Sequence, residues 1–105
     1  MAAKNITKQE FHELLKGSKP VLVDYWAPWC GYCRSIEPVY ARIGEEYAET
    51  LEVVKINTDQ EPELAQAEQI EVIPTLVLYT DGKYAGSIVA PESAAMIREF
   101  IEKTI

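Results

Sequence analysis

The stretch that organises this sequence is residues 24–34, Asp24-Tyr25-Trp26-Ala27-Pro28-Trp29-Cys30-Gly31-Tyr32-Cys33-Arg34. It contains both cysteines and both tryptophans of the 105-residue chain. An apolar run, Val21-Leu22-Val23, precedes it, and apolar residues at helical spacing follow it. Because continuous apolar runs are typical of strands buried on both faces, we predict a central strand that leads into a helix. Both thiols then lie where this helix begins.

Length, composition and charge limit the possible functions. Hydrophobic residues make up 48% of the sequence and charged residues 26%, as in ordinary globular proteins. A chain of 105 residues is long enough for one hydrophobic core, so we expect a single domain over residues 1–105. We also expect a monomer. The net charge of -7 repels phosphate and anionic lipid, which argues against nucleic-acid and membrane partners. The N-terminal residues do not have the pattern of a signal peptide, so we expect a cytoplasmic protein.

The rest of the sequence alternates predicted strands and helices. Strands are predicted at 21–26, 51–57, 75–79 and 84–89, with a short edge strand within 2–5, and helices at 7–16, 32–48, 62–69 and after residue 91. Pro38 is expected to bend the second helix rather than break it. Asp81-Gly82 predicts a hairpin between the last two strands. This order predicts an α/β fold with a mixed sheet of four to five strands flanked by four helices.

Cys30 and Cys33 allow three interpretations. A zinc site would normally need four ligands, but the sequence has no second cysteine pair, and its single histidine, His12, lies on another predicted element. A structural disulfide across so short a loop would stabilise the fold little. A dithiol that cycles between reduced and oxidised states is favoured, because residues three apart at a helix start can bring their sulfurs together. All three interpretations remain open at this point.

The positions of the two cysteines predict different roles for them. Cys30 lies just ahead of the helix, where free backbone N–H groups favour a thiolate, so Cys30 is the expected nucleophile. Cys33 lies inside the first turn and is expected to be less accessible, which suits a thiol that resolves a mixed disulfide. We predict that Trp29 is exposed beside Cys30 and contacts a partner, whereas Trp26 belongs to the core.

These motifs resemble the thioredoxin family over nearly the whole chain. The matching residues are the Val23-Asp24-Tyr25-Trp26-Ala27 approach, Trp29-Cys30-Gly31, Cys33, Pro38, Lys55, Asn57, Asp59, the Ile73-Pro74-Thr75 turn and Gly82. The resemblance implies a thioredoxin fold and a thiol-disulfide oxidoreductase that reduces protein disulfides. It implies a redox-active Cys30–Cys33 disulfide with no bound cofactor and no metal. It also implies disulfide-bearing protein substrates and a thioredoxin reductase, a flavin enzyme that supplies electrons from NADPH.

The resemblance implies roles for four further residues. Asp24 matches the family's buried acid, whose pKa is raised by burial and which helps to deprotonate Cys33. Lys55 matches the lysine that lies near this acid. The Ile73–Pro74 peptide bond is expected to be cis, with the Ile73 backbone pairing with an extended substrate segment.

Three positions, Tyr32, Arg34 and Ala90, depart from the family pattern, and Arg34 keeps the positive charge of the usual lysine. The residues between the cysteines are Gly31 and Tyr32, where thioredoxins usually have Gly-Pro, so this pair is expected to tune the site. Tyr32 restores a backbone N–H near the sulfurs, and we expect the extra donor to stabilise the Cys30 thiolate and make the protein more oxidising. Ala90 stands where the family commonly has glycine, and its methyl group is expected to narrow the substrate groove.

Two alternative functions fit the same motifs. One is a disulfide oxidase or isomerase, which would use the dithiol in the opposite redox direction. The other is a binding subunit that uses this fold as a docking surface. A measured redox potential separates the first alternative from a reductase, and a variant without cysteines separates the second.

Overall fold

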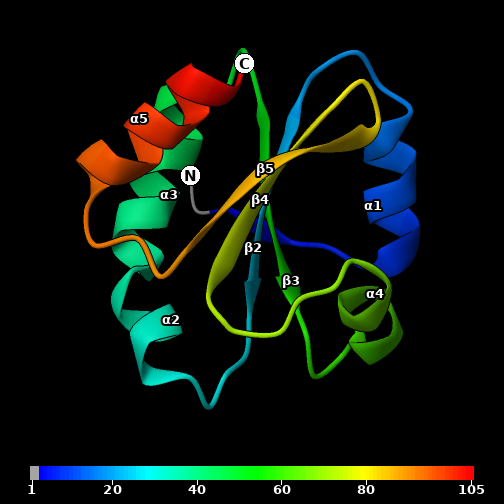
Figure 1. Cartoon of the computed structure of the whole chain (residues 1–105), viewed down its shortest axis with the longest axis vertical. Helices are drawn as coiled ribbons and strands as arrows, with labels where there is room; N and C mark the ends of the chain where they lie inside the picture. The colour runs from blue at the N-terminus through cyan, green and yellow to red at the C-terminus, as the bar shows by residue number, and fades with distance from the viewer. Residues whose placement is uncertain (1–2) are drawn as a thin grey trace.

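A five-stranded mixed sheet forms the centre of the computed structural model, which describes residues 3–105 (Figure 1). The strands are β1 (Lys4–Asn5), β2 (Val21–Trp26), β3 (Glu52–Asn57), β4 (Thr75–Thr80) and β5 (Lys83–Val89). Their order in the sheet is β1-β3-β2-β4-β5. β2 pairs in parallel with β3 and antiparallel with β4, so the predicted central strand is confirmed.

Helices cover both faces of this sheet. They are α1 (Lys8–Leu15), α2 (Gly31–Ser35), α3 (Glu37–Glu46), α4 (Pro62–Ala67) and α5 (Ala94–Thr104). Figure 1 shows α1 and α4 on one side of the sheet and α3 and α5 on the other, with α2 following the lower end of β2. Within residues 3–105, no helix is long and apolar enough to cross a membrane.

Local signals in the sequence explain where several elements begin and end. At the start of α1, the Thr7 hydroxyl accepts a hydrogen bond from the Glu10 N–H (3.1 Å), and the Glu10 carboxylate accepts one from the Thr7 N–H (2.9 Å). Between β4 and β5, Asp81 and Gly82 adopt positive φ angles of 53° and 76°, as a tight hairpin requires. The predicted edge strand is present as β1, and the part of that prediction at residue 2 lies outside the described residues.

The helix predicted at 32–48 differs from the expectation. The structure divides it at Ile36 into α2 and α3, so five helices rather than four flank the sheet within residues 3–105, and the expected single bent helix was wrong. Pro38 has no N–H to donate to the carbonyl of Arg34, four residues earlier. The last N–H of α2, that of Ile36, donates to the carbonyl of Tyr32 at 3.2 Å. Cys33 therefore lies on a short helix that is separate from α3.

The core has one layer on each face of the sheet. Val21, Val23 and Tyr25 of β2 pack in the layer under α1 and α4, whereas Leu22 packs in the layer under α3 and α5. Side chains alternate along a strand, so Asp24 points to the same face as Leu22. The strand that carries the core therefore also directs one carboxylate towards α3.

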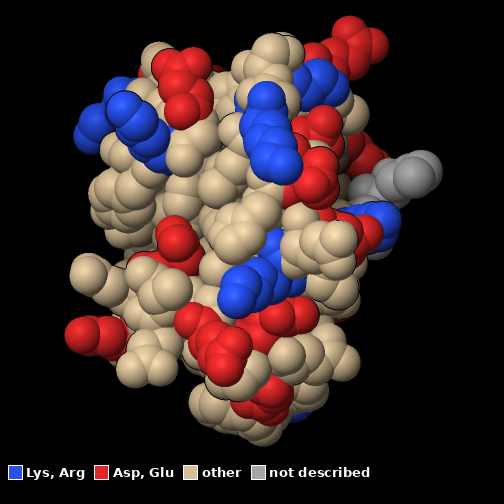
Figure 2. All heavy atoms as spheres, turned by 90° about the vertical axis from the view of Figure 1, so that its right-hand side faces the viewer, with Lys and Arg blue, Asp and Glu red and all other residues tan. Residues whose placement is uncertain are grey.

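Charged side chains of both signs lie on the face that carries α1 and α4. Figure 2 shows acidic side chains around and between the basic ones on this face. The mixture agrees with the net charge of -7 for the whole chain. Among the described residues, this face does not present a continuous basic track for a phosphate backbone.

Candidate active site

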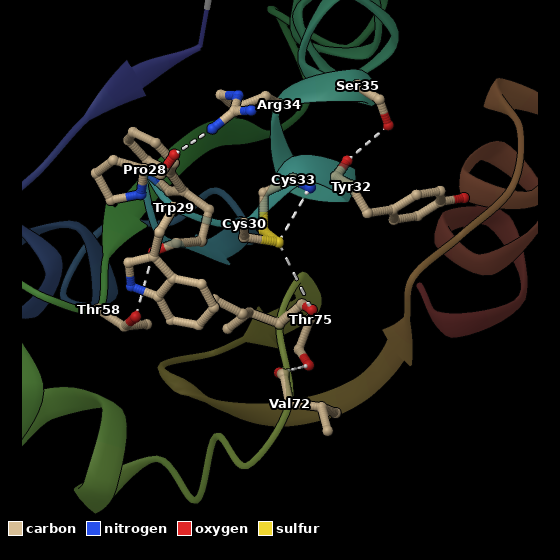
Figure 3. Close-up of a disulfide and its surroundings, with 12 residues drawn as sticks. Pro28, Trp29, Cys30, Tyr32, Cys33, Arg34, Ser35, Thr58, Val72 and Thr75 are labelled. Atoms are coloured by element: carbon tan, nitrogen blue, oxygen red, sulfur yellow. Dashed lines mark hydrogen bonds between the residues drawn. A yellow bond between two sulfur atoms is a disulfide. The ribbon is translucent and has the colours of Figure 1, made fainter.

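The two cysteines lie at the start of α2 and form a disulfide (Figure 3). Cys30 is the N-cap residue, with φ -86° and ψ 108°, and its sulfur accepts a hydrogen bond from the Cys33 N–H at 3.2 Å. Cys30 is 8% exposed and Cys33 3% exposed. Both sulfurs are thus shielded, and the more accessible cysteine is Cys30.

Two aromatic side chains flank this disulfide. Figure 3 shows Trp29 and Tyr32 on opposite sides of the sulfurs. Trp29 is 68% exposed, which confirms its predicted surface position, and its indole N–H donates to Asp59 at 3.2 Å. Trp26 is only half-buried, so its prediction as a core residue was wrong: its indole reaches past β3 to donate to Asn5 on the edge strand at 2.7 Å.

The loop before β4 lies beside Cys30. The Ile73–Pro74 peptide bond is cis, as the resemblance implied, and the Ile73 carbonyl oxygen lies 3.9 Å from the Cys30 sulfur. Ala90 donates its N–H to the Pro74 carbonyl at 2.9 Å. Ala90 has a φ of 46°, a conformation that favours glycine, which explains why alanine at this position is unusual. The structure thus brings Ile73, Pro74 and Ala90 together on one side of the disulfide.

The Tyr32 hydroxyl reaches a segment far away in the sequence. It donates to the carbonyl of Pro91 at 2.8 Å, across 59 residues. The ring, 42% exposed, thereby joins α2 to the segment that leads into α5. Sequence analysis missed this contact, because one hydroxyl and one backbone carbonyl form no sequence pattern. Gly31 is exposed, and a Cβ there would meet no heavy atom within 4 Å, so close packing does not require its glycine.

Asp24 is buried in the middle of β2, as expected. It is 2% exposed, and its Oδ1 has no hydrogen-bond partner among the described residues. Burial raises the pKa of Asp24 to about 7, against the opposing effect of Lys55, and Glu37 adds to the rise. The carboxyl group therefore exchanges its proton near neutral pH.

Lys55 lies directly beside Asp24 on β3, where the two residues are register partners. Its ammonium group contacts Glu37 of α3 at 3.1 Å and lies 4.7 Å from the centroid of the Trp26 ring. Sequence analysis assigned Lys55 to the site and missed Glu37. A glutamate in the first turn of the helix after Cys33 was a possible signal, but it does not tell which strand residue the glutamate contacts.

The described residues do not form a metal-binding cluster at this site. Within residues 3–105, no group of three or more His, Cys, Asp or Glu side chains could hold a metal ion. Cys30 and Cys33 are instead bonded to each other. The geometry therefore supports redox chemistry at the sulfurs.

Comparisons with known proteins agree with this geometry. A family model described as Thioredoxin matches residues 2–103. The chain is 41% identical to Thioredoxin 1 of Synechococcus elongatus over 87% of this chain and 85% of that protein. It is 38% identical to thioredoxin of Porphyra purpurea over 100% of this chain and 99% of that protein. The crystal structure of oxidised mitochondrial thioredoxin 3 from Saccharomyces cerevisiae superposes with a TM-score of 0.85 at 27% identity, covering 96% and 94% of the two chains.

These similarities, taken with the disulfide, decide both fold and activity. The fold is the thioredoxin fold that the motifs implied. The protein is a thiol-disulfide oxidoreductase of the protein-disulfide reductase type, and its redox group is the Cys30–Cys33 disulfide. Its substrates are protein disulfides, and a reductase restores its dithiol. The chain belongs to the thioredoxin family.

Proposed function

We propose that the reduced protein attacks substrate disulfides with Cys30, resolves the resulting mixed disulfide with Cys33, and uses Asp24 as the proton acceptor for Cys33. The observation that carries this proposal is the position of the Cys30 sulfur, 3.2 Å from the Cys33 N–H and 3.9 Å from the Ile73 carbonyl. An N–H group aimed at a sulfur favours its thiolate form. The lower exposure of Cys33 suits a thiol that acts second.

The proposed reaction has two sulfur exchanges. The Cys30 thiolate attacks one sulfur of the substrate disulfide, the substrate S–S bond breaks, and one substrate thiolate leaves. Cys33 then loses its proton to Asp24 and attacks the Cys30 sulfur of the mixed disulfide. The second substrate thiolate leaves and takes up a proton, and the Cys30–Cys33 disulfide remains. Two electrons have moved from the protein to its substrate.

The proposed substrate site surrounds Cys30. An extended substrate segment would pair with the Ile73 backbone beside Pro74 and lie between Trp29 and Ala90. The exposure of Trp29 and the hydrogen bond from Ala90 to Pro74 support this arrangement. Because backbone hydrogen bonds depend little on the substrate's side chains, such a site accepts substrates of varied sequence.

Lys55 is proposed to assist Asp24. Its ammonium group, on the neighbouring strand, opposes the rise in the Asp24 pKa and keeps the carboxyl able to ionise near pH 7. Asp24→Asn should therefore slow the release of substrate from the mixed disulfide, with little change in its formation. Release rates that are equal in the two proteins across pH would exclude the acid–base role.

The proposed electron donor is a flavin-dependent thioredoxin reductase that consumes NADPH. Reduction of insulin disulfides with NADPH and a thioredoxin reductase tests partner and activity together. Wild type should reduce insulin, and Cys30→Ser should not. If a variant with both cysteines changed to serine kept the biological activity, the protein would be a binding subunit instead. The cytoplasmic location stays a prediction, and the similar M-type thioredoxins of Chlamydomonas reinhardtii and Pisum sativum are chloroplastic.

We also propose that the Cys-Gly-Tyr-Cys sequence makes the protein a stronger oxidant than a Gly-Pro version. Proline at position 32 would remove a backbone N–H near the sulfurs, so one hydrogen-bond donor fewer would be available to stabilise the Cys30 thiolate. Wild type and Tyr32→Pro should be compared in glutathione redox buffers. The variant should be more reducing, and an equal or more oxidising variant would refute the proposal. A wild-type potential far above that of a reductase would favour the oxidase or isomerase alternative.

A further inference from the structure

Lys55 has two possible carboxylate partners and contacts one of them. Its ammonium group is 3.1 Å from Glu37 and stacks over the Trp26 ring at 4.7 Å. Asp24 is its register partner on the neighbouring strand, yet Oδ1 of Asp24 has no hydrogen-bond partner among the residues described. A buried acceptor without a partner costs free energy, and a lysine on the adjacent strand could satisfy it. Another contact must therefore keep the Lys55 ammonium away from the Asp24 carboxyl.

We propose that Glu37 is a positioning residue that holds the Lys55 ammonium on the outer side of the site and thereby leaves the Asp24 carboxyl unpaired and able to accept the Cys33 proton. This inference rests on the proposed role of Asp24. The Lys55 side chain is 9% exposed and that of Glu37 is 46% exposed, so the ion pair runs from the interior towards solvent. Glu37 and Trp26 both contact the cation.

The groups that act on Asp24 come from the elements packed against it. Lys55 lies on β3, Glu37 and Tyr40 lie on α3, and the neighbouring position on β4 is the apolar Leu76. Burial raises the pKa of Tyr40 well above its usual range, and its hydroxyl donates to the carbonyls of β2 and β3, so this phenol stays neutral. α2 contributes Cys33, which is a thiol only when the disulfide is reduced. Lys55 and Glu37 are thus the charges that can set the state of Asp24.

An ordinary surface salt bridge would have a different effect. Exposed ion pairs are screened by solvent and contribute little. Here the lysine end of the pair is buried beside a buried acid, where charges are screened less by solvent. Removal of the Glu37 charge should therefore favour ionisation of Asp24 in two ways. One nearby negative charge disappears, and the Lys55 ammonium becomes free to approach the Asp24 carboxyl.

The test is the titration of the Asp24 carboxyl, followed by carbon NMR in the reduced protein. Glu37→Gln should lower the titration midpoint by about one pH unit, as expected when an opposite charge moves within reach of a carboxylate. Glu46→Gln is a matched control on the same helix, because Glu46 pairs with Arg98 and not with Lys55. It should leave the Asp24 midpoint unchanged. An unchanged or raised midpoint in Glu37→Gln overturns the inference.

The same Glu37→Gln change in a Lys55→Met protein separates the positioning of Lys55 from the direct effect of the Glu37 charge. In Lys55→Met, the Glu37→Gln change can act only through the lost negative charge, so its effect on the Asp24 midpoint should be clearly smaller than in wild type. Equal effects in the two backgrounds would overturn the positioning role. If Lys55→Met does not fold, a crystal structure of Glu37→Gln decides the question. Lys55 should then lie within ion-pair distance of Asp24, and a lysine still over Trp26 overturns the inference.

The kinetic readout distinguishes this inference from the proposed function. The pH profile of substrate release from the mixed disulfide should shift with the Asp24 midpoint in Glu37→Gln. A shifted Asp24 titration with an unshifted release profile supports the positioning by Glu37 and refutes the acid–base role of Asp24. An unshifted titration refutes the positioning, whatever the release profile.

Discussion

Asp24 and Tyr25 are neighbours on β2, and both bury a polar group. The Tyr25 hydroxyl has a hydrogen-bond partner, whereas one oxygen of Asp24 has none among the described residues. Tyr25 points into the layer under α1 and α4, where its hydroxyl lies 2.8 Å from that of Tyr79. Tyr79 in turn donates to Glu68 at 2.7 Å. This hydrogen-bond chain, Tyr25-Tyr79-Glu68, leads from the core to the end of α4. On the other face, Asp24 has an oxygen with no partner among the described residues.

The difference shows how one strand serves stability on one face and chemistry on the other. Burial raises the pKa of Tyr25 and of Tyr79 above their usual ranges, so both phenols stay neutral. Their hydrogen bonds are satisfied, and this arrangement stabilises the fold. Asp24 has the opposite character: its pKa of about 7 lets it change charge near neutral pH, at a cost in stability whenever it is ionised.

The largest predicted effect comes from removing the charge of Asp24. Its pKa is about 7 in the folded state and near 3.8 in the unfolded chain, so the folded state binds the extra proton between these values. The stability from this proton is fully present below pH 3.8 and is lost as the pH rises through about 7. The loss amounts to at most about 4 kcal/mol.

Asp24→Asn should lack this loss. It should be more stable than wild type at pH 8, by up to about 4 kcal/mol, and similar to wild type near pH 4. Urea unfolding of both proteins across this pH range measures the difference. A difference that stays constant with pH would mean that Asp24 ionises equally in the folded and unfolded states, and the contrast with Tyr25 would disappear.

The second effect has the opposite sign and concerns the other face. Tyr79→Phe removes the central hydroxyl of the hydrogen-bond chain and leaves the buried Tyr25 hydroxyl without its partner. The free energy of unfolding should fall by about 2 kcal/mol. Tyr84→Phe is a matched control, because Tyr84 is exposed on β5 and its hydroxyl contacts only Ser87 among the described side chains. If the two variants unfold at the same urea concentration, the hydrogen-bond chain Tyr25-Tyr79-Glu68 does not stabilise the fold.

The smallest effect is expected for Tyr25→Phe. This change removes the inner end of the chain, while Tyr79 keeps its hydrogen bond to Glu68. The loss should be about 1 kcal/mol, smaller than for Tyr79→Phe, because only one bond is lost and no buried hydroxyl is left without a partner. A larger loss for Tyr25 than for Tyr79 would show that the inner bond dominates.

The sequence predicted the features that depend on local pattern. The apolar run before Asp24 predicted the central strand, which the structure has as β2. The helix predicted at 7–16 is present as α1, which Thr7 and Glu10 cap. The resemblance supplied the cis bond before Pro74, which local pattern does not show.

The sequence did not predict contacts whose geometry depends on the assembled fold. Glu37 and Lys55 are 18 residues apart, and Tyr32 and Pro91 are 59 apart. Glutamate, lysine and tyrosine are also common on surfaces, so their presence alone signals no partner. The break at Ile36 was missed because Pro38 allows either a bend or an interruption, and only packing of α2 and α3 decides between them.

The central place of β2 has a consequence for how the protein is made. β2 and both cysteines are synthesised before β3 and well before β4, although β2 lies between these two strands in the sheet. At typical translation speeds, the ribosome needs roughly 2 to 10 seconds to extend the chain from Cys33 to the end of β4. For most of this time the nascent thiols lack their neighbour Ile73, which comes just before β4. Ribosome-bound chains that end before or after β4 should therefore differ in how fast a thiol reagent alkylates Cys30 and Cys33.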